Sequence, residues 1–468
     1  MKPLPLSRIA QWTGGRLVGT GAAGLDVLID TITTDTRTLD ASDGRAALFV
    51  AIRGERFDGN AHVADAALAG ARAVLVSIQS DDTIPQVVVP DTERALAAFA
   101  AALQHTRTGQ VIAITGSNGK TSVKAMLLSI LQRVAVVQGR SAYANPGNRN
   151  NEIGLPLAVL DAPEDAQFAI YEMGAGKPGD IAYLTAIARP DVALVNNVAP
   201  AHLERMGNLL GVADTKGAIY DALPSGGVAV INADDAFAPY FAERAHGRRL
   251  IRFGLEATAD VSARDVTLHG EGSRFVLVTE QGEVNVVLSL PGRHNVLNAL
   301  AAASLALGAG ASPDAIADGL MAARAVAGRL VTHRLPSGAT LIDDSYNANP
   351  GSLNAAIDLL AGGGGEQWLV LGDMRELGAD AQALHAEAGR RAGSAGITRL
   401  FTLGPLSAAA ADAFGTGGVH FDSHAALAEA LRAAMTADIR VLVKGSRGSA
   451  MEQVVRALLA PAGDTDAA

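Results

Sequence analysis

The segment 111–131, VIAITGSNGKTSVKAMLLSIL, constrains the fold more strongly than any other part of the chain. Its continuous apolar run at 111–114 is typical of a strand buried on both faces of a parallel sheet. Apolar residues then recur at 123, 126, 127, 130 and 131, a spacing that places them on one face of a helix. A buried strand, a glycine loop and a helix therefore follow one another directly, which predicts an α/β fold.

The loop of this segment has the composition of a phosphate-binding site. Gly116 and Gly119 allow backbone N–H groups to approach a ligand closely, and the N-terminus of the following helix attracts anions. Lys120 adds a positive charge, and the hydroxyl of Thr121 suits Mg²⁺. The pattern T-G-x-x-G-K-T is a shortened variant, because Ile114 stands where G-x-x-x-x-G-K-[ST] has glycine. We interpret it as a triphosphate site; the alternative is a glycine loop that carries a surface lysine by chance.

Composition and charge narrow the classes of function. The 468 residues include 38 Lys and Arg against 48 Asp and Glu, and the net charge of −10 argues against a general nucleic-acid or anionic-membrane binder. With no cysteine, the chain has no disulfide, thiolate metal site or thiol catalysis. The N-terminus lacks the apolar core of a signal peptide, and the most apolar later stretch, 297–311, is shorter than the roughly 20 residues of a membrane span. We expect a cytoplasmic protein.

Strand-like and helix-like segments alternate along the chain and predict three α/β domains. Residues 1–108 form a small domain, residues 109–326 a central one with a parallel-rich sheet, and residues 327–468 a doubly wound one that ends in a disordered tail at 461–468. The expected strands of the last two domains are 111–115, 168–173, 191–198, 227–232, 340–344, 368–372, 399–404 and 440–445, and the expected helices of the third are 354–360, 381–391 and 425–435.

Ligands of open parallel sheets bind beyond the carboxyl ends of the strands, so polar residues after the strands are candidates for a site. Glu172 and His202 each follow an expected strand and, with Thr121, could hold Mg²⁺. Each could instead be an ordinary loop residue. Lys216 follows nearby, where a cation would repel a metal; it fits only as a phosphate contact or as a lysine made anionic by carbon dioxide.

Asparagine and basic residues supply further candidates. The Asn-rich loop 145–156 could bind a polar ligand or be a turn-rich connector. Asn295 and Asn298 lie three residues apart at the start of an Ala/Leu-rich helix, where they could contact adenine or act as cap residues. Lys444 and Arg447 follow a strand and precede a helix, which suits a peptide carboxylate, although both could be solvated charges.

Several motifs together resemble the Mur ligases, the ATP-dependent amide-forming enzymes of peptidoglycan precursor synthesis. DDSYNANPGSLNAA (343–356) and LGDMRELG (371–378) are similar to the MurF branch, and the Asp-Asn-Pro-Arg motif of MurE chains is absent. The resemblance spans nearly the whole chain through TGSNGKT (115–121), NNEIGLP (150–156), YEMGAGKPGD (171–180), PDVALVNNVAPAHLERMG (190–207), DTKGAIY (214–220), LPGRHNVLNALAA (290–302) and IDDSYNANP (342–350).

The resemblance implies an N-terminal UDP-substrate domain, a central ATPase and a C-terminal Rossmann-like domain. It implies ATP and Mg²⁺ as cofactors, UDP-N-acetylmuramoyl-tripeptide and D-alanyl-D-alanine as substrates, no nucleic acid or membrane partner, and a monomer. The implied catalytic residues are Lys120, His202, Lys216, which would be carbamylated, and Arg329. The implied ATP contacts are Thr115, Gly116, Ser117, Asn118, Gly119, Lys120, Thr121, Asn295, Asn298, Arg329 at the γ-phosphate and Asp344 at the ribose. The implied metal ligands are Thr121, Glu172 and His202, and the implied substrate contacts are Thr36, Arg37, Asn150, Asn151, Lys444, Ser446 and Arg447.

Two positions depart from the MurF pattern: Asn60 stands where His is usual, and Ala218 where Glu is frequent. The implied reaction forms an acyl phosphate on the tripeptide, which the dipeptide amine attacks. We expect an open arrangement without ligand, with domain closure bringing Arg329 and Asp344 onto the nucleotide. The alternatives are a sister amide ligase, MurE-like or folylpolyglutamate-synthase-like, and a P-loop nucleotide-binding protein without ligase activity.

Overall fold

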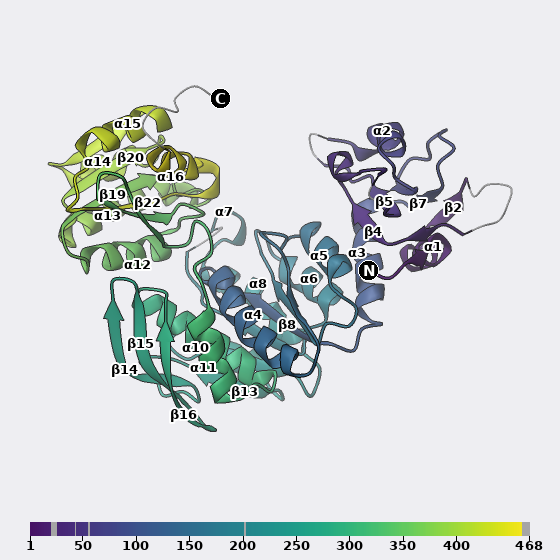
Figure 1. Cartoon of the computed structure of the whole chain (residues 1–468), viewed down its shortest axis with the longest axis horizontal. Helices are drawn as coiled ribbons and strands as arrows, with labels where there is room; N and C mark the ends of the chain where they lie inside the picture. The colour runs from purple at the N-terminus through teal and green to yellow at the C-terminus, as the bar shows by residue number, and fades with distance from the viewer. Residues whose placement is uncertain (20–25, 43, 55–56, 201–202, 461–468) are drawn as a thin grey trace.

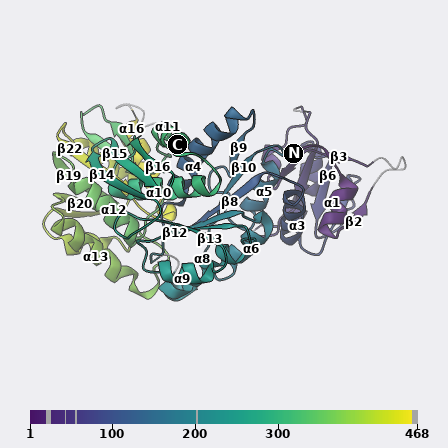
Figure 2. The ribbon, with the colours of Figure 1, turned by 90° about the horizontal axis from the view of Figure 1, so that it is seen from below.

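The computed structural model describes residues 1–19, 26–42, 44–54, 57–200 and 203–460. Three α/β units follow one another along the chain. The N-terminal and C-terminal units lie at opposite ends of the molecule, with the central unit between them (Figures 1 and 2). The tail at 461–468 lies outside the described residues. Among the described residues, no helix is both long enough and apolar enough to cross a bilayer.

The N-terminal unit contains a five-stranded sheet in the order β2-β7-β6-β5-β4, in which only β2 is antiparallel to its neighbour. Helix α3 begins after Asp91, whose carboxylate accepts hydrogen bonds from the N–H groups of Glu93 and Arg94. The elements of the N-terminal unit are β1 (Leu4–Pro5), α1 (Leu6–Thr13), β2 (Arg16–Val18), β3 (Leu28–Ile29), β4 (Thr31–Thr33), β5 (Ala47–Val50), α2 (Val63–Leu68), β6 (Ala73–Val76), β7 (Gln86–Val88) and α3 (Thr92–Gln104).

Helix α3 also connects this unit to the central one. Its buried residues Leu96, Phe99 and Leu103 belong to the same apolar cluster as Leu155 and Val159 of α5. Burying these side chains together removes apolar surface of both units from water. The first two units therefore share one continuous core.

The central unit is built on a six-stranded parallel sheet in the order β13-β12-β11-β8-β10-β9. Its strands and helices are β8 (Gln110–Thr115), α4 (Lys120–Val137), β9 (Ala142–Ala144), α5 (Gly154–Asp161), β10 (Phe168–Glu172), α6 (Asp180–Ala188), β11 (Val192–Val195), α7 (Leu203–Met206), α8 (Leu209–Asp221), β12 (Val228–Asn232), α9 (Ala238–Arg244), β13 (Arg249–Phe253), α10 (Arg293–Gly308) and α11 (Pro313–Ala322).

A three-stranded antiparallel sheet interrupts this alternating order and was not predicted. It consists of β14 (Ser262–His269), β15 (Gly272–Thr279) and β16 (Gly282–Leu288). One face of β15 is buried through Phe275 and Leu277, which pack with α10 and α11 in one apolar cluster. Gly282, which begins β16 directly after the two-residue turn at 280–281, was the available signal for a hairpin.

The C-terminal unit has a six-stranded sheet in the order β17-β18-β22-β19-β20-β21, and only the edge strand β17 is antiparallel to its neighbour. Together with the central sheet this confirms the predicted α/β class. Strands β17 and β21 and helix α14 were not predicted, whereas the helix expected after Arg447 is present as α16. The elements are β17 (Val331–Arg334), β18 (Thr340–Asp344), α12 (Pro350–Ala361), β19 (Glu366–Gly372), α13 (Ala381–Ser394), β20 (Arg399–Leu403), α14 (Ala408–Phe414), β21 (Gly418–Phe421), α15 (His424–Ala434), β22 (Ile439–Lys444) and α16 (Glu452–Leu459).

The packing of α11 on α4 yields a test of the fold. A Cβ at Gly319 would lie 2.4 Å from the Cα of Ile130, and Ser129 Oγ donates a hydrogen bond to the Gly319 carbonyl at 2.8 Å. Because neither backbone can move freely, we expect Gly319→Ala to lower stability by about 1–3 kcal/mol, as overpacking does. Thermal unfolding of the full chain should show a lower Tm.

The matched control is Gly226→Ala, where an added Cβ meets no atom within 4 Å. This variant should keep the Tm of the unmodified chain. Equal Tm values for the Gly319 and Gly226 variants would contradict the close approach of α11 to α4.

Candidate active site

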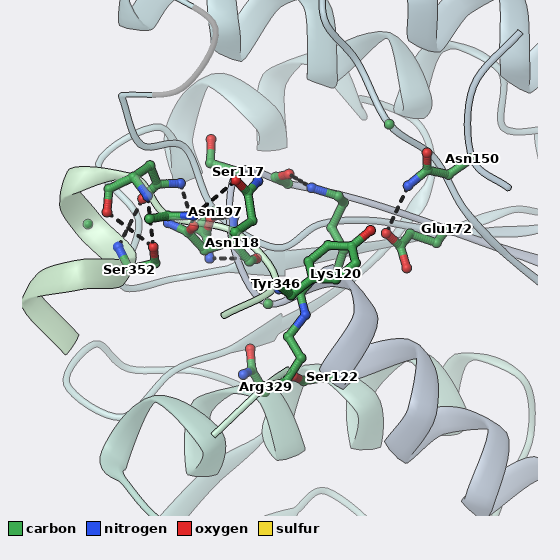
Figure 3. A pocket seen from close by; sticks show the side chains of 18 of the residues that line it. Ser117, Asn118, Lys120, Ser122, Asn150, Glu172, Asn197, Arg329, Tyr346 and Ser352 are labelled. Atoms are coloured by element: carbon green, nitrogen blue, oxygen red, sulfur yellow. Dashed lines mark hydrogen bonds between the residues drawn. The ribbon is translucent and has the colours of Figure 1, made fainter. Parts of the chain in front are cut away.

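The site lies where the carboxyl ends of the central strands meet. Strand β8 is bordered by β10 and β11, so that the loop after β8 lies at the point where the strand order reverses. A pocket of about 590 Å³ opens there, and residues of the C-terminal unit, among them Tyr346 and Asn349, complete its lining. Its volume is within the range of ligand sites, roughly 300–1,000 Å³. Figure 3 shows this pocket from close by.

The glycine loop after β8 is held in a conformation that its two glycines make possible. Gly116 and Gly119 have φ values of 146° and 80°. A Cβ at Gly119 would lie 2.4 Å from Asn298 Oδ1 and 2.5 Å from Asn196 Nδ2, so that a side chain has no room there. Lys120, at the start of α4, folds back and donates to the Gly116 carbonyl at 2.6 Å. The loop thus curls around the helix N-terminus, an arrangement suited to phosphates.

Two asparagines after β11 fix the loop, and the sequence analysis did not name them. The N–H of Asn118 donates to Asn197 Oδ1 at 2.8 Å, and Asn196 Nδ2 donates to the Asn118 carbonyl at 2.9 Å. Ser117 N–H donates to the Asn197 carbonyl at 3.0 Å. At the end of β8, Thr115 is buried and donates to the Met173 carbonyl at 3.0 Å. The NNV run directly after a buried strand was the signal for this support.

Glu172 is the buried carboxylate of the pocket, with 4% of its surface exposed. Asn150 Nδ2 donates to its Oε1 at 3.0 Å, while Oε2 lies 3.1 Å from the ammonium of Lys124 but has no hydrogen bond. Burial by itself would raise the pKa of Glu172, but Lys124 and Lys120 together outweigh it and lower that pKa. The carboxylate is therefore ionised, and its Oε2 already faces one cation, the ammonium of Lys124.

Lys124 is a further residue near the pocket that was not predicted from the sequence. It lies one helical turn after Lys120, and its ammonium also donates to the carbonyls of Asn145 at 2.9 Å and Gly147 at 3.1 Å. A lysine on the apolar face of a helix needs such partners, because an unpaired buried charge is unfavourable. Its position four residues after Lys120 could have identified it.

Lys216 lies on α8 and is the most deeply buried lysine near the pocket, with 2% of its surface exposed. No hydrogen bond or ion pair joins its side-chain nitrogen to another described residue. Desolvation, reinforced by the charge of Lys120, lowers the pKa of Lys216 to about 7. Burial also lowers the pKa of Lys120 itself. In a large fraction of the molecules, the Lys216 side chain is therefore a neutral amine near pH 7.

Asn295 and Asn298 lie together on the first turn of α10, both buried, and line the pocket. Asn298 Nδ2 donates to Asn295 Oδ1 at 3.3 Å, while Asn295 Nδ2 donates to the Pro291 carbonyl at 2.8 Å. Asn196 Nδ2 donates to Asn298 Oδ1 at 3.2 Å. The two amides thus form one network with the glycine loop, and their contact with adenine stays a prediction.

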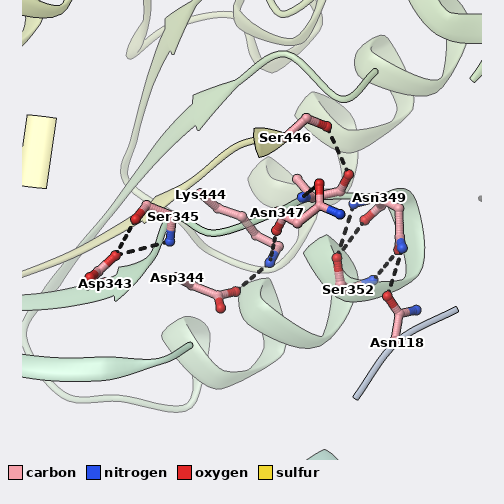
Figure 4. A network of polar contacts seen from close by, with 10 residues as sticks. Asn118, Asp343, Asp344, Ser345, Asn347, Asn349, Ser352, Lys444 and Ser446 are labelled. Atoms are coloured by element: carbon pink, nitrogen blue, oxygen red, sulfur yellow. Dashed lines mark hydrogen bonds and ion pairs between the residues drawn. The ribbon is translucent and has the colours of Figure 1, made fainter. Parts of the chain in front are cut away.

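The C-terminal side already touches the loop in this structure. Arg329 donates from Nη2 to Thr121 Oγ1 at 3.1 Å, and Asn349 Nδ2 donates to Asn118 Oδ1 at 2.7 Å (Figure 4). The expectation of an open arrangement is therefore wrong for this structure as far as these two units are concerned. The physical reason is that these side chains pair with loop groups that would otherwise lack partners.

Asp344 and Lys444 form a buried ion pair (Figure 4). Lys444 also donates to the Asn347 carbonyl at 3.0 Å, and Ser446 Oγ donates to the Ala348 carbonyl at 3.1 Å. Both charges line the pocket, but each now has a partner that the sequence did not reveal. Arg447, by contrast, is exposed and 3.3 Å from Glu452. Of the two predicted contacts for a peptide carboxylate, Arg447 is the more accessible.

The structure does not bring every candidate into the pocket. Thr36 and Arg37 lie in the N-terminal unit, where Arg37 pairs with Asp35 at 2.6 Å. That contact lowers the pKa of Asp35 to about 2. Asn151 lines the pocket, and its Oδ1 accepts from the N–H of Gly154 at 2.8 Å.

The candidate metal ligands are only partly described. His202 lies outside the described residues, and the described ones contain no group of three or more His, Asp or Glu side chains that could hold a metal ion. Thr121 and Glu172 therefore remain candidates, and the oxygen of Glu172 that has no hydrogen bond fits a cation ligand.

Comparison with known proteins places this pocket in context. Residues 114–306 match the Mur ligase middle domain, and residues 328–447 match the Mur ligase glutamate ligase domain. The UDP-N-acetylmuramoyl-tripeptide–D-alanyl-D-alanine ligase of Escherichia coli K12 is 42% identical over 98% of this chain and 99% of its own length. The ligase of the same name from Bacillus subtilis is 34% identical, over 92% and 93%.

Solved structures of MurF ligases are similar to this chain over most of its length. A crystal structure of MurF from Acinetobacter baumannii superimposes with a TM-score of 0.90 at 32% identity, covering 98% of this chain and 99% of that one. The MurF ligase of Thermotoga maritima in complex with ADP gives a TM-score of 0.80 at 27% identity, over 92% and 96%.

The geometry of Lys120 yields a test of the pocket. Its ammonium lies at the mouth of the glycine loop and is the charge best placed to meet transferring phosphate. We expect Lys120→Ala to fold and to lose about 100- to 1000-fold in the rate of ATP cleavage, the effect of removing one preorganised electrostatic contact. The measurement is steady-state phosphate release at saturating substrates.

Arg133→Ala, at an exposed position of the same helix, is the control and should keep full activity. Retention of more than a tenth of the turnover by Lys120→Ala would rule out this role for the lysine.

Proposed function

The chain belongs to the Mur ligase family, and we propose that it joins D-alanyl-D-alanine to UDP-N-acetylmuramoyl-tripeptide with cleavage of ATP to ADP and phosphate. Full-length similarity to ligases of that name supports this choice of substrates. The observation that carries the proposal is the pocket at the ends of β8, β10 and β11. There the glycine loop, a buried carboxylate and an arginine from the C-terminal side converge. Because the reaction consumes ATP, we place it in the cytoplasm.

The reaction proceeds in two steps. A carboxylate is a poor electrophile, so the terminal carboxylate of the tripeptide first attacks the γ-phosphorus of ATP, and ADP leaves. The amine of D-alanyl-D-alanine then attacks the carbonyl carbon of the acyl phosphate, loses a proton and expels inorganic phosphate. Catalysis of this kind rests on positioning and charge stabilisation.

Different residues of the pocket provide the positioning and the charge stabilisation. Backbone N–H groups of 116–121 and Lys120 hold the phosphates at the N-terminus of α4, and Arg329 reaches the same end from the opposite side. Asn295 and Asn298 would contact adenine, and Asp344 the ribose. Contacts between the C-terminal unit and the loop exclude water, which would otherwise hydrolyse the acyl phosphate.

Mg²⁺ fits the residues present, because Glu172 is ionised and has one buried oxygen without a hydrogen bond. We propose Thr121, Glu172 and His202 as its ligands. When bound, the ion would neutralise charge on the phosphates of ATP.

Lys216 has the properties required for a reaction with carbon dioxide. The neutral amine attacks the carbon of CO₂, a C–N bond forms, and one proton is released, which leaves a carbamate with a single negative charge. A pKa of about 7 makes the neutral amine abundant near neutral pH. The positive charge of Lys120 that lowers this pKa would also favour the anionic product. We propose that Lys216 acts as this carbamate.

The substrate proposal predicts which acceptors support ATP cleavage. With ATP, Mg²⁺ and UDP-N-acetylmuramoyl-tripeptide, phosphate release should be fast only with D-Ala-D-Ala, and the product should gain the mass of one dipeptide. Free D-Ala, L-Ala-L-Ala, diaminopimelate and glutamate should be poor acceptors, because each leaves polar groups of the site unpaired. Phosphate release across this panel is the measurement.

Two outcomes would contradict the proposal. Faster turnover with diaminopimelate or lysine on a UDP-dipeptide would favour a MurE-like ligase. ATP cleavage that is independent of every amine would favour a nucleotide-binding protein without ligase activity.

The Lys216 proposal predicts a dependence on carbon dioxide and pH. Below pH 7 the amine is protonated and cannot react, and above it the neutral form dominates, so that a carbamate carbon signal in ¹³C NMR with labelled CO₂ should strengthen as pH rises through about 7. The comparison is made at constant dissolved CO₂. Lys216→Ala should lack this signal, be inactive, and recover partly with short carboxylic acids.

Arg133→Ala again serves as the matched variant and should keep both signal and activity. A signal of unchanged strength in Lys216→Ala, or full activity of that variant, would disprove the carbamate.

A further inference from the structure

The ring of Tyr346 contacts two arginine side chains that come from different segments of the chain. The guanidinium carbon of Arg329 lies 4.3 Å from the ring centroid, and that of Arg447 lies 5.7 Å from it. Both distances fall within the range of cation–π contacts, about 6 Å. Arg329 belongs to the connection between α11 and β17, whereas Arg447 follows β22. One half-buried ring therefore lies beside both of the arginines that we assign to the γ-phosphate and to the dipeptide carboxylate.

The backbone holds this ring in place from the Arg329 side. The N–H of Tyr346 donates to the Gly328 carbonyl at 3.2 Å. Gly328 has a φ of +71°, and a Cβ there would lie 3.1 Å from the Cβ of Tyr346. The segment that carries Arg329 and the segment that carries Tyr346 are thus in close backbone contact, and the stacking geometry is set before any ligand binds.

A stacked arginine keeps its hydrogen-bond donors for a ligand. A guanidinium has five N–H donors, and stacking on a ring face uses none of them. Arg329 donates from Nη2 to Thr121, while its buried Nε has no partner among the described residues. Such an unpartnered donor is unfavourable until an anion arrives. The contact with the ring therefore restrains Arg329 and leaves its donors available to a ligand, apart from the one that Thr121 accepts.

We propose that Tyr346 is a positioning residue that aligns Arg329 with the γ-phosphate of ATP and Arg447 with the carboxylate of the incoming dipeptide. The inference rests on the proposed function and extends it, because nothing in the comparisons assigns a role to this tyrosine. Since one ring supports both guanidinium groups, it sets the separation of the two anions that they bind. The aromatic face, and not the hydroxyl, is the part required.

The first test asks whether Tyr346 affects the binding of the γ-phosphate and not that of the rest of the nucleotide. The affinities of Tyr346→Leu and Tyr346→Phe for ADP and for a non-hydrolysable ATP analogue are measured by calorimetry with Mg²⁺ present. Tyr346→Leu should bind the ATP analogue about 10-fold more weakly, the size of one partly desolvated cation–π contact, and ADP within about 2-fold of the unmodified chain. Tyr346→Phe keeps the ring and should bind both normally.

The second test concerns the dipeptide. Tyr346→Leu should raise the KM for D-Ala-D-Ala about 10-fold. When Arg447→Ala is already present, Tyr346→Leu should raise this KM no further, because the contact between Arg447 and the ring is already lost. Tyr240→Leu is the control: Tyr240 also contacts an arginine, Arg244, at 3.1 Å, but lies on α9 outside the pocket. It should change neither nucleotide binding nor KM.

The outcomes are distinct. If Tyr346→Leu weakens ADP and the ATP analogue equally, or if Tyr346→Phe behaves like Tyr346→Leu, the positioning role is wrong. If Tyr346→Leu lowers the Tm, Tyr346→Met repeats the same comparison. Failure of the unmodified chain to release phosphate with the dipeptide would refute the proposed function, while the nucleotide titrations would still decide the Arg329 half of the inference.

Discussion

The close approach of α10 to the glycine loop is the contact on which the rest of the site depends. Gly119 lies against Asn298 and Asn196 with no room for a Cβ, and those two amides are themselves hydrogen-bonded to each other. Strand β11 holds the same loop through Asn197. The loop is therefore clamped between elements of the central unit, and its N–H groups are oriented without help from a ligand. Preorganisation of this kind is what makes electrostatic stabilisation effective in an enzyme.

Buried charge is the second constraint, and it follows from the first. Lys120 and Lys124 lie close to the buried carboxylate of Glu172, and Lys216 is buried near Lys120. Cations are in excess in this cluster. Burial lowers the pKa values of Lys120 and Lys216, and the charge of Arg329 adds to the effect on Lys120 while that of Lys120 adds to the effect on Lys216. A polyanionic nucleotide would reverse this imbalance. The acidic net charge of the whole chain thus coexists with a locally cationic cluster, because these lysines lie near one another on α4 and α8.

Much of the fold and of the candidate site could be predicted from the sequence, and the exceptions have physical reasons. The strands around Thr115, Glu172 and Asp344 were predicted because continuous apolar runs mark strands buried on both faces. The antiparallel sheet at 262–288 was missed because its strands are only half-buried and β14 lacks the kind of continuous apolar run from which the other strands were predicted. Glycine loop residues carry a recognisable pattern, whereas Asn197 and Asn349 act through tertiary contacts that no local spacing encodes. The pairing of Lys444 with Asp344, 100 residues away, could not be inferred from either residue alone.

The connection between the central and C-terminal units ties the chemistry to the arrangement of the domains. Leu330, next to Arg329, has a φ of 56°, a left-handed conformation that costs a leucine about 1–2 kcal/mol. Its side chain packs against the apolar cluster of Ile342 and Leu353, and this burial offsets the strain. The backbone of the linker is thereby held by the C-terminal core, while the neighbouring arginine reaches the central loop. Any rotation of the C-terminal unit must consequently move Arg329 relative to Thr121. The phosphate end of the pocket is therefore complete only when the two units lie together, which makes their contact a condition of catalysis.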